Sequence, residues 1–416
     1  MTPLAHGVGS RQDLPIPFSF AVTGAALALV ISFVALGLLW REPRLVPREE
    51  EGEARAPWVW RVLGLLLAAW FCVGLLFGPD TADNPTAGAF YVVFWVGLAF
   101  ASLLLGPVWR ALNPLRTVHL LASRALRRDP ADGFAPYPER LGYWPATAGL
   151  FAFVWLELVA PERATLPVIQ AWLLAYVGFT LVGAATFGSR WFDRGDPFEA
   201  YSDVVGRLSP LRGNPLDGIA GLRAAPGLVP LVVVLLGSTM YDSMSGSPQW
   251  IRFVQESTAS APVLGTLGLL GVIGIVLVAY LVATGLAGRL GKARGTPGEL
   301  AHTIVPVAVG YVVAHYFSLF VLEGQRTLAL ASDPRDTGAN WFGTANWGLS
   351  SAGLNPTMIA TVQVTVIVLG HLVGTVLAHD RALVLFPRRT AVAGQVPLLA
   401  LMVAYTVTGL LLLFAA

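Results

Sequence analysis

The sequence has very little of the charge that keeps a protein dissolved in water. Charged residues make up 12% of its 416 residues, about half of the fraction usual in a soluble domain. Hydrophobic residues make up 55%, and the mean hydropathy is +0.65. This composition excludes an ordinary soluble domain and predicts an integral membrane protein. The net charge of +2 gives no reason to expect a nucleic acid as a partner.

Cysteine and the local motifs of soluble enzymes are also scarce. Cys72 is the only cysteine and lies in an apolar run, which excludes an intrachain disulfide framework and a cysteine-rich metal site. The sequence contains no His-Glu-x-x-His, P-loop or Gly-x-Ser-x-Gly motif. Lys292 is the only lysine, and Ala, Gly and Leu dominate, which is typical of a GC-rich bacterial genome. We therefore expect a multi-pass protein of a bacterial plasma (inner) membrane.

Long apolar runs predict an all-α, polytopic helical bundle whose main partner is the lipid bilayer. About 20 apolar residues cross the hydrocarbon core as a helix. Ten segments approach this length, at 18–40, 58–78, 89–109, 145–160, 167–188, 228–246, 262–288, 303–322, 357–379 and 396–415. The predicted organisation is an extracytoplasmic lead-in at 1–17 and one ten-helix domain at 18–416.

The basic residues predict the orientation of this bundle. Of 27 lysines and arginines, 22 fall in the loops after the first, third, fifth, seventh and ninth spans. Loops rich in arginine face the cytoplasm, so both termini should be extracytoplasmic. Residues 117–128 interleave leucines with arginines, which is typical of a helix in the headgroup layer. Residues 325–355 form the predicted outer loop.

Ionisable side chains at membrane depth are the candidate functional residues. They lose hydration that lipid cannot replace, so they normally face a cavity, a partner or a metal ion. His315 and His371 lie inside long apolar runs, and Asp242 and Glu323 lie at the outer level of their spans. We predict His315, His371, Asp242 and Glu323 as catalytic residues of a site near the outer leaflet.

Histidine and carboxylate together are also a ligand set for a divalent metal ion, which would turn a bound water into a nucleophile. The predicted ligands are His315, Asp242, Glu157 and, from the lead-in, His6. The same side chains would suit a proton relay, so both interpretations stay open. A third interpretation is structural, with each histidine bonded to a neighbouring helix.

Several stretches resemble one bacterial, largely actinobacterial, family of multi-pass membrane proteins whose members are often named fenitrothion hydrolase. They are Ala5-His6-Gly7 to Asp13-Leu14-Pro15, Ala314-His315-Tyr316-Phe317-Ser318 with Glu323-Gly324-Gln325, and Gly370-His371 with Ala378-His379-Asp380-Arg381. The resemblance covers the whole chain. It implies hydrolysis of an organophosphorothioate triester, an apolar small molecule that would enter from the bilayer. The alternative is a proton- or ion-coupled transporter of a small solute that uses the intramembrane histidines.

Overall fold

The computed structural model describes residues 13–48, 57–350 and 355–414, and in these residues the regular structure is entirely helical. The chain forms two compact units. Of the described residues, unit 1 comprises 13–48, 213–318 and 355–414, and unit 2 comprises 57–212 and 319–350. The division falls inside one long helix, α16 (Val305–Leu330), which contributes to both units.

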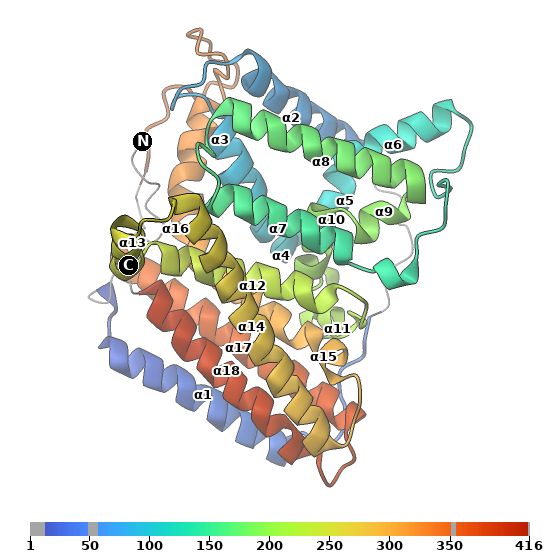
Figure 1. Ribbon diagram of the computed structural model, residues 1–416, viewed down its shortest axis with the longest axis vertical. Coiled ribbons are helices and arrows are strands. Elements are labelled where there is room, and N and C mark those ends of the chain that lie inside the picture. The colour runs from blue at the N-terminus through green and yellow to red at the C-terminus, as the bar shows by residue number, and fades with distance from the viewer. Residues whose placement is uncertain (1–12, 49–56, 351–354, 415–416) are drawn as a thin grey trace. The chain divides into compact units, whose positions relative to one another are not determined.

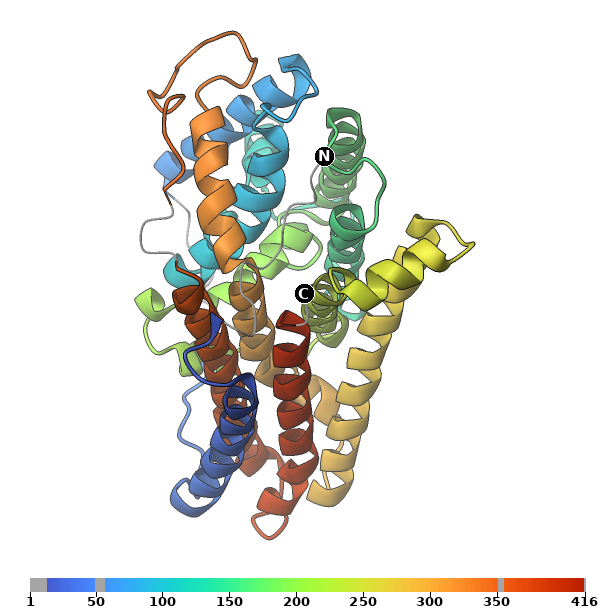
Figure 2. The ribbon, with the colours of Figure 1, turned by 90° about the vertical axis from the view of Figure 1, so that its left-hand side faces the viewer.

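Unit 1 is a bundle of long apolar helices. Besides the first part of α16 it contains α1 (Phe18–Leu39), α11 (Pro215–Ala220), α12 (Leu228–Ser245), α13 (Pro248–Glu256), α14 (Ala261–Gly291), α15 (Thr296–Glu299), the short η5 (Ala301–Ile304), α17 (Pro356–Leu385) and α18 (Ala391–Leu413). Helix α18 packs on α14, α17 and α1, and α12 packs on α14. In Figures 1 and 2 these long helices run side by side.

Glycines bring α16 and α17 into backbone contact. A Cβ atom at Gly310 would lie 2.6 Å from the carbonyl oxygen of Val366, and one at Gly370 would lie 2.4 Å from that of Pro306. In lipid, helices associate through such close packing because the bilayer supplies no hydrophobic drive between them. The two helices are thus held in a fixed antiparallel register, which sets the depth of every side chain on them.

Unit 2 consists of shorter helices. They are α2 (Trp58–Phe77), α3 (Thr86–Gly88), the π-helix η2 (Ala89–Val96), α4 (Gly97–Leu105), α5 (Val108–Leu112), α6 (Pro114–Ala125), η3 (Glu139–Leu141), α7 (Trp144–Leu158), α8 (Leu166–Phe187), α9 (Arg190–Arg194), α10 (Pro197–Gly206) and η4 (Pro210–Arg212). Helix α10 packs on α4, α5 and α7. Its Phe198 lies within 5.2 Å of the ring centroids of Phe94, Phe153 and Tyr176. This aromatic core fixes α10 in the centre of the unit.

The protein is an all-α, multi-pass membrane protein. In the described part of the chain nine helices are long and apolar enough to cross a bilayer. They match nine of the ten predicted spans. The remaining one, predicted at 145–160, corresponds to α7, whose 15 residues reach only about 22 Å, against a hydrocarbon core of about 30 Å. The extracytoplasmic position of both termini stays a prediction, since it depends on whether α7 crosses.

Two further boundaries differ from the sequence-based expectation. Helix α16 continues to Leu330, so the first six residues of the predicted outer loop at 325–355 are helical. The predicted surface helix at 117–128 begins earlier and ends earlier, as α6. Most of the lead-in, including His6, lies outside the described residues.

Candidate functional site

Two membrane-spanning helices of unit 1, α12 and α16, bring an aspartate and a histidine into direct contact. Nε2 of His315 lies 2.9 Å from Oδ2 of Asp242. On the other side of the imidazole ring, Nδ1 lies 3.1 Å from the hydroxyl oxygen of Ser243. Asp242 and His315 are only 5% and 3% exposed. The pair is therefore a buried ionisable site at membrane depth.

Two tyrosines of α16 extend this pair into a longer hydrogen-bonded network. The Tyr316 hydroxyl donates to Oδ2 of Asp242 at 2.8 Å, and the Tyr311 hydroxyl donates to Oγ of Ser243 at 2.9 Å. Both tyrosines are buried. The network thus runs from Tyr311 through Ser243, His315 and Asp242 to Tyr316.

The polar end of α12 can sit in an apolar bundle because its hydroxyl groups bond to their own helix. Thr239 donates to the carbonyl oxygen of Leu235 at 2.9 Å, and Oγ of Ser243 lies 3.3 Å from the carbonyl oxygen of Thr239. Hydroxyl side chains often bond one turn back in this way. The Ser243 hydroxyl therefore has two alternative hydrogen-bond acceptors, the Thr239 carbonyl oxygen and Nδ1 of His315.

This choice allows the network to hold His315 in two protonation states. When the ring is neutral, Nε2–H donates to Asp242, and the Ser243 hydroxyl donates to Nδ1. When the ring is protonated, Nδ1–H donates to Ser243, whose own hydroxyl turns to the Thr239 carbonyl. In neither state does a polar atom of the pair lose its partner, so the usual penalty for a buried unsatisfied group is avoided.

His371, the second predicted catalytic histidine, lies elsewhere in unit 1. It follows Gly370, which packs against Pro306 of α16. His315 is nine residues further along α16, or about 13 Å along the helix axis. Nδ1 of His371 lies 2.8 Å from the carbonyl oxygen of Ile367, and Nε2 has no hydrogen-bond partner in the described part of the chain. Because a carbonyl only accepts, Nδ1 carries the proton and Nε2 is a buried acceptor.

The other predicted site residues are in unit 2 or outside the described residues. Glu323 lies on the second part of α16, 3.7 Å from Arg326, and Glu157 lies near the end of α7. His6 is not among the described residues. Of the predicted metal ligands, His315 and Asp242 lie in contact within unit 1, and these two use the facing atoms to bond to each other. Within residues 13–48, 57–350 and 355–414, no three His, Cys, Asp or Glu side chains are close enough to hold a metal ion.

A second histidine–aspartate segment lies near the carboxyl end of α17. Nδ1 of His379 lies 2.9 Å from Oε1 of Gln395, and Nε2 lies 2.8 Å from the carbonyl oxygen of Trp40. Oδ1 of Asp380 accepts hydrogen bonds from the indole of Trp40 and the amide of Arg44. These contacts tie the segment after α1 to α17 and α18.

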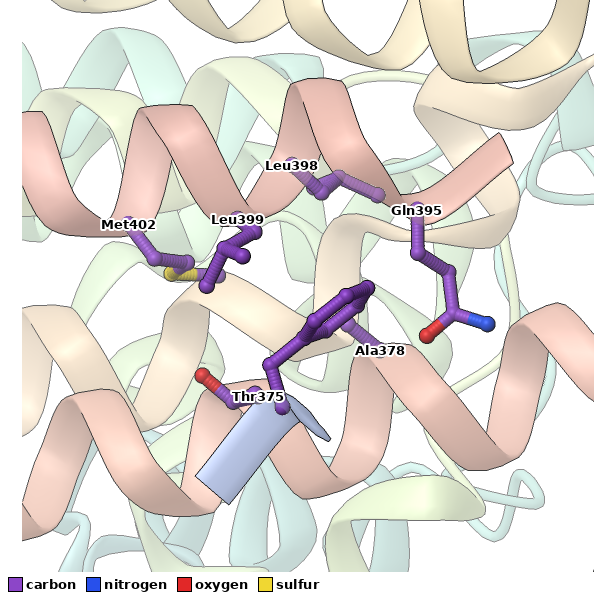
Figure 3. A pocket seen from close by; sticks show the side chains of 7 residues that line it. Thr375, Ala378, Gln395, Leu398, Leu399 and Met402 are labelled. Carbon is purple, nitrogen blue, oxygen red and sulfur yellow. The ribbon is translucent and has the colours of Figure 1, made fainter. Parts of the chain in front are cut away.

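Gln395 also lines a small pocket whose lining residues come from α1, α17 and α18 (Figure 3). Thr375, Ala378, Leu398 and Met402 are among the other lining residues. The lining is largely apolar, and the pocket lies one helical turn from His371 through Thr375.

In comparisons with known proteins, no family model, no curated protein and no solved structure matches the chain. The functional interpretation therefore rests on the side-chain geometry.

The site predicted from the sequence includes His315 and Asp242 but none of the other three members of the network, Tyr311, Ser243 and Tyr316. Tyr311, His315 and Ser318 share a helical stripe and are visible as polar residues in an apolar run, whereas Tyr316 lies about 100° around the helix from His315. Its contact with Asp242 depends on the way that α12 crosses α16. No spacing within α16 predicts that contact.

Proposed function

We propose that the protein is a proton-coupled carrier of a small solute, in which the His315–Asp242 pair takes up and releases the coupling proton. The observation that carries this proposal is the hydrogen-bond network, which satisfies His315 in both its neutral and its protonated form. A group that must change charge repeatedly inside a membrane needs such a network. Intramembrane ionisable residues commonly mark the pathways of protons and ions.

The local charge balance supports the same proposal. A protonated His315 beside an ionised Asp242 has no net charge, and the pair is buried. Loss of the proton leaves one negative charge on Asp242, toward which the Tyr316 hydroxyl already points. Removing a charge from water costs several kcal/mol unless it is paired and hydrogen-bonded. The site thus limits the cost of both states, which is what reversible proton binding requires.

The placement of the pair favours a role in conduction across the bilayer. It joins α12 and α16, and 78% of the apolar window of each of these spans is buried inside the protein. The outer helices are much less buried, with 11% for Phe18–Leu39 and 22% for Ala261–Gly291. The ionisable pair thus lies on the two spans with the largest buried fraction among those that the structure describes.

Proton flux into vesicles tests the proposal. Purified protein is reconstituted into liposomes with a trapped pH indicator, and a potassium diffusion potential, inside negative, drives proton entry. Flux is measured with and without the low-molecular-mass fraction of a bacterial extract as the source of solute. We expect flux above that of empty liposomes, and its loss in His315→Gln and Asp242→Asn.

His119→Gln is the matched control, because this histidine lies in unit 2 and contacts the carbonyl oxygen of Pro130. The control variant should keep the wild-type flux. Wild-type flux no faster than in empty liposomes, in both conditions, would overturn the proposal, as would full flux in His315→Gln.

The second candidate function is hydrolysis of an organophosphorus triester, and the contact between Ser243 and His315 is the observation that favours it. His315 lies between Ser243 and Asp242, so the neutral ring is a base that Asp242 orients through Nε2–H and whose Nδ1 faces the Ser243 hydroxyl. In this function the Ser243 hydroxyl gives its proton to Nδ1 and takes one from a water, the water oxygen attacks phosphorus, and the aryloxide leaves. The organophosphorothioate resemblance in the sequence agrees with this chemistry.

Release of a nitrophenol from an aryl phosphorothioate by membranes that contain the protein is the corresponding assay. Hydrolysis should be lost in His315→Ala and reduced in Asp242→Asn, while His119→Gln should hydrolyse at the wild-type rate. Release equal to that of empty membranes, with and without added ions, would remove this candidate.

A further inference from the structure

Unit 2 contains a buried cluster of five charged side chains that the proposed function does not use. It joins four short helices and consists of Arg110 of α5, Arg116 of α6, Asp193 of α9, and Asp196 and Glu199 at the start of α10. Glu199 and Asp196 are 1% and 0% exposed. Arg110 and Asp193 are partly open, with side chains 29% and 27% exposed. The cluster therefore has a buried end and an end open to solvent.

Glu199 lies at the centre of this cluster. Its Oε2 accepts hydrogen bonds from Nε of Arg116 and from the side-chain amide of Asn113, both at 3.2 Å. Its Oε1 lies 2.7 Å from Nη2 of Arg116 and 3.5 Å from Nε of Arg110, and it accepts no hydrogen bond in the described part of the chain. Oε1 of this fully buried carboxyl group thus has two ion-pair contacts but no hydrogen bond within the described residues.

Asp196 is the deepest member of the cluster. Its Oδ1 caps α10 by accepting from the amides of Phe198 and Glu199, at 2.9 and 3.0 Å. Its Oδ2 accepts from the hydroxyl of Tyr176 at 2.8 Å and from the side-chain amide of Asn113 at 3.3 Å. Asn113 therefore bridges the two buried carboxyl groups, and Tyr176 connects them to the membrane-spanning helix α8.

The charges of the cluster do not balance. Two guanidinium groups, those of Arg110 and Arg116, face the three carboxyl groups of Asp193, Asp196 and Glu199, so full ionisation leaves one net negative charge in a largely buried space. Tyr176 is a neutral donor and adds no charge. An uncompensated buried charge is expensive, and a carboxyl group normally takes up a proton instead.

We propose that this cluster is a second proton-binding site, in which Glu199 and Asp196 share one proton near neutral pH. The bound species is the neutral carboxylic acid, formed from a carboxylate and a proton from solvent, and the proton returns to solvent when the pH rises. Burial raises the pKa of both carboxyl groups, in agreement with the charge count. Asp193 forms the partly exposed end of the cluster, and Tyr176 of α8 contacts its buried end.

The proposal does not depend on the carrier function or on His315, because the two sites belong to different units and have no residue in common. Experiments can therefore refute either proposal without affecting the other. A proton site on this cluster would also be compatible with either candidate function of the first site.

Infrared difference spectroscopy of the full-length protein in lipid tests the proposal. A protonated carboxyl group has a carbonyl band that a carboxylate lacks. We expect a band that is present at pH 6, disappears by pH 9 and is shifted by deuteration. Glu199→Gln should lose the titrating band or move its midpoint by more than one pH unit, and so should Asp196→Asn.

The matched control is Asp203→Asn. Asp203 lies one turn further along α10 and pairs with Arg207 at 3.2 Å, so its removal takes away a carboxyl group of the same helix without changing the buried pair. This control and His315→Gln should both keep the band. Wild-type protein without a titrating band between pH 6 and 9 would overturn the proposal even if both cluster variants failed to fold. A titrating band that is unchanged in folded Glu199→Gln and Asp196→Asn would overturn it as well.

Discussion

Replacing Glu199 with glutamine should remove much of the pH dependence of the protein's stability. Burial raises the pKa of this carboxyl group to about 7, from the ordinary 4.5 that it has in the unfolded chain. The folded state therefore binds the proton more tightly than the unfolded state. The resulting stabilisation is fully present below pH 4.5 and is lost as the pH rises through about 7.

The size of the effect follows from the difference between the folded and unfolded pKa values of Glu199. A tenfold difference in proton affinity is worth about 1.4 kcal/mol, so this carboxyl group lowers the free energy of unfolding by about 3 kcal/mol between acid and alkaline pH. Asp196 contributes in the same direction, because burial raises its pKa as well. The glutamine amide has nearly the same shape as the carboxyl group and does not titrate. The variant should therefore keep the packing and lose most of the slope of the free energy of unfolding against pH.

Thermal unfolding in detergent from pH 5 to 8.5 measures this slope. Wild-type protein and the Asp203→Asn control should lose several degrees of unfolding temperature across this range, and Glu199→Gln should lose much less. Equal slopes in the wild type and in Glu199→Gln would refute the reasoning, as would a wild-type stability that increases with pH.

Two further predictions concern packing and topology. Gly370→Ala should destabilise the protein by about 1–3 kcal/mol in an unfolding titration, since its Cβ would overlap a backbone oxygen, whereas Gly271→Ala should be tolerated because nothing lies within 4 Å of its Cβ. In a Cys72→Ser background, an impermeant thiol reagent applied to intact cells should label a cysteine at Arg252 but not one at Ala125. Labelling of both positions or of neither would mean that α7 does not cross the bilayer.

Much of the fold is predictable from the sequence, because lipid imposes one strong rule on backbone groups. Every amide in the hydrocarbon region must bond within its own helix, so a long apolar run determines a helix and its approximate ends. The short α7 shows where the rule is weakest, since an apolar run of 15 residues fits a buried helix as well as a span. The sequence also places the start of the outer loop too early, because Glu323 and Arg326 suggest the end of a span, while the helix continues to Leu330.

The candidate site is predictable only in part, because depth in a membrane is visible in a sequence and lateral contact is not. Asp242, His315, Glu323 and Glu157 form one predicted group because each is expected at the outer level. The structure pairs Asp242 with His315, and it assigns Glu323 and Glu157 to unit 2.

The buried cluster of unit 2 has no signal in the sequence. Arg116 directly precedes a stretch that interleaves leucine with arginine, which predicts a place among lipid headgroups. In the structure it is buried, and its partner Glu199 is 83 residues away. Asn113 caps the same helix by accepting from the amides of Leu115 and Arg116, and its side-chain amide donates to Glu199. Pairing over such a separation depends on tertiary packing.

The most direct test of the central claim is the protonation state of His315, read by nitrogen-15 NMR of histidine-labelled protein in lipid. His315→Gln identifies its signals among those of the six histidines. We predict that the His315 ring changes reversibly between the neutral form, with N–H on Nε2, and the doubly protonated form when a proton gradient across the lipid vesicles is imposed and removed. Asp242→Asn should abolish this change, because it removes the partner of Nε2. A His315 ring that stays in one form with and without the gradient would contradict the claim that this site takes up and releases a proton.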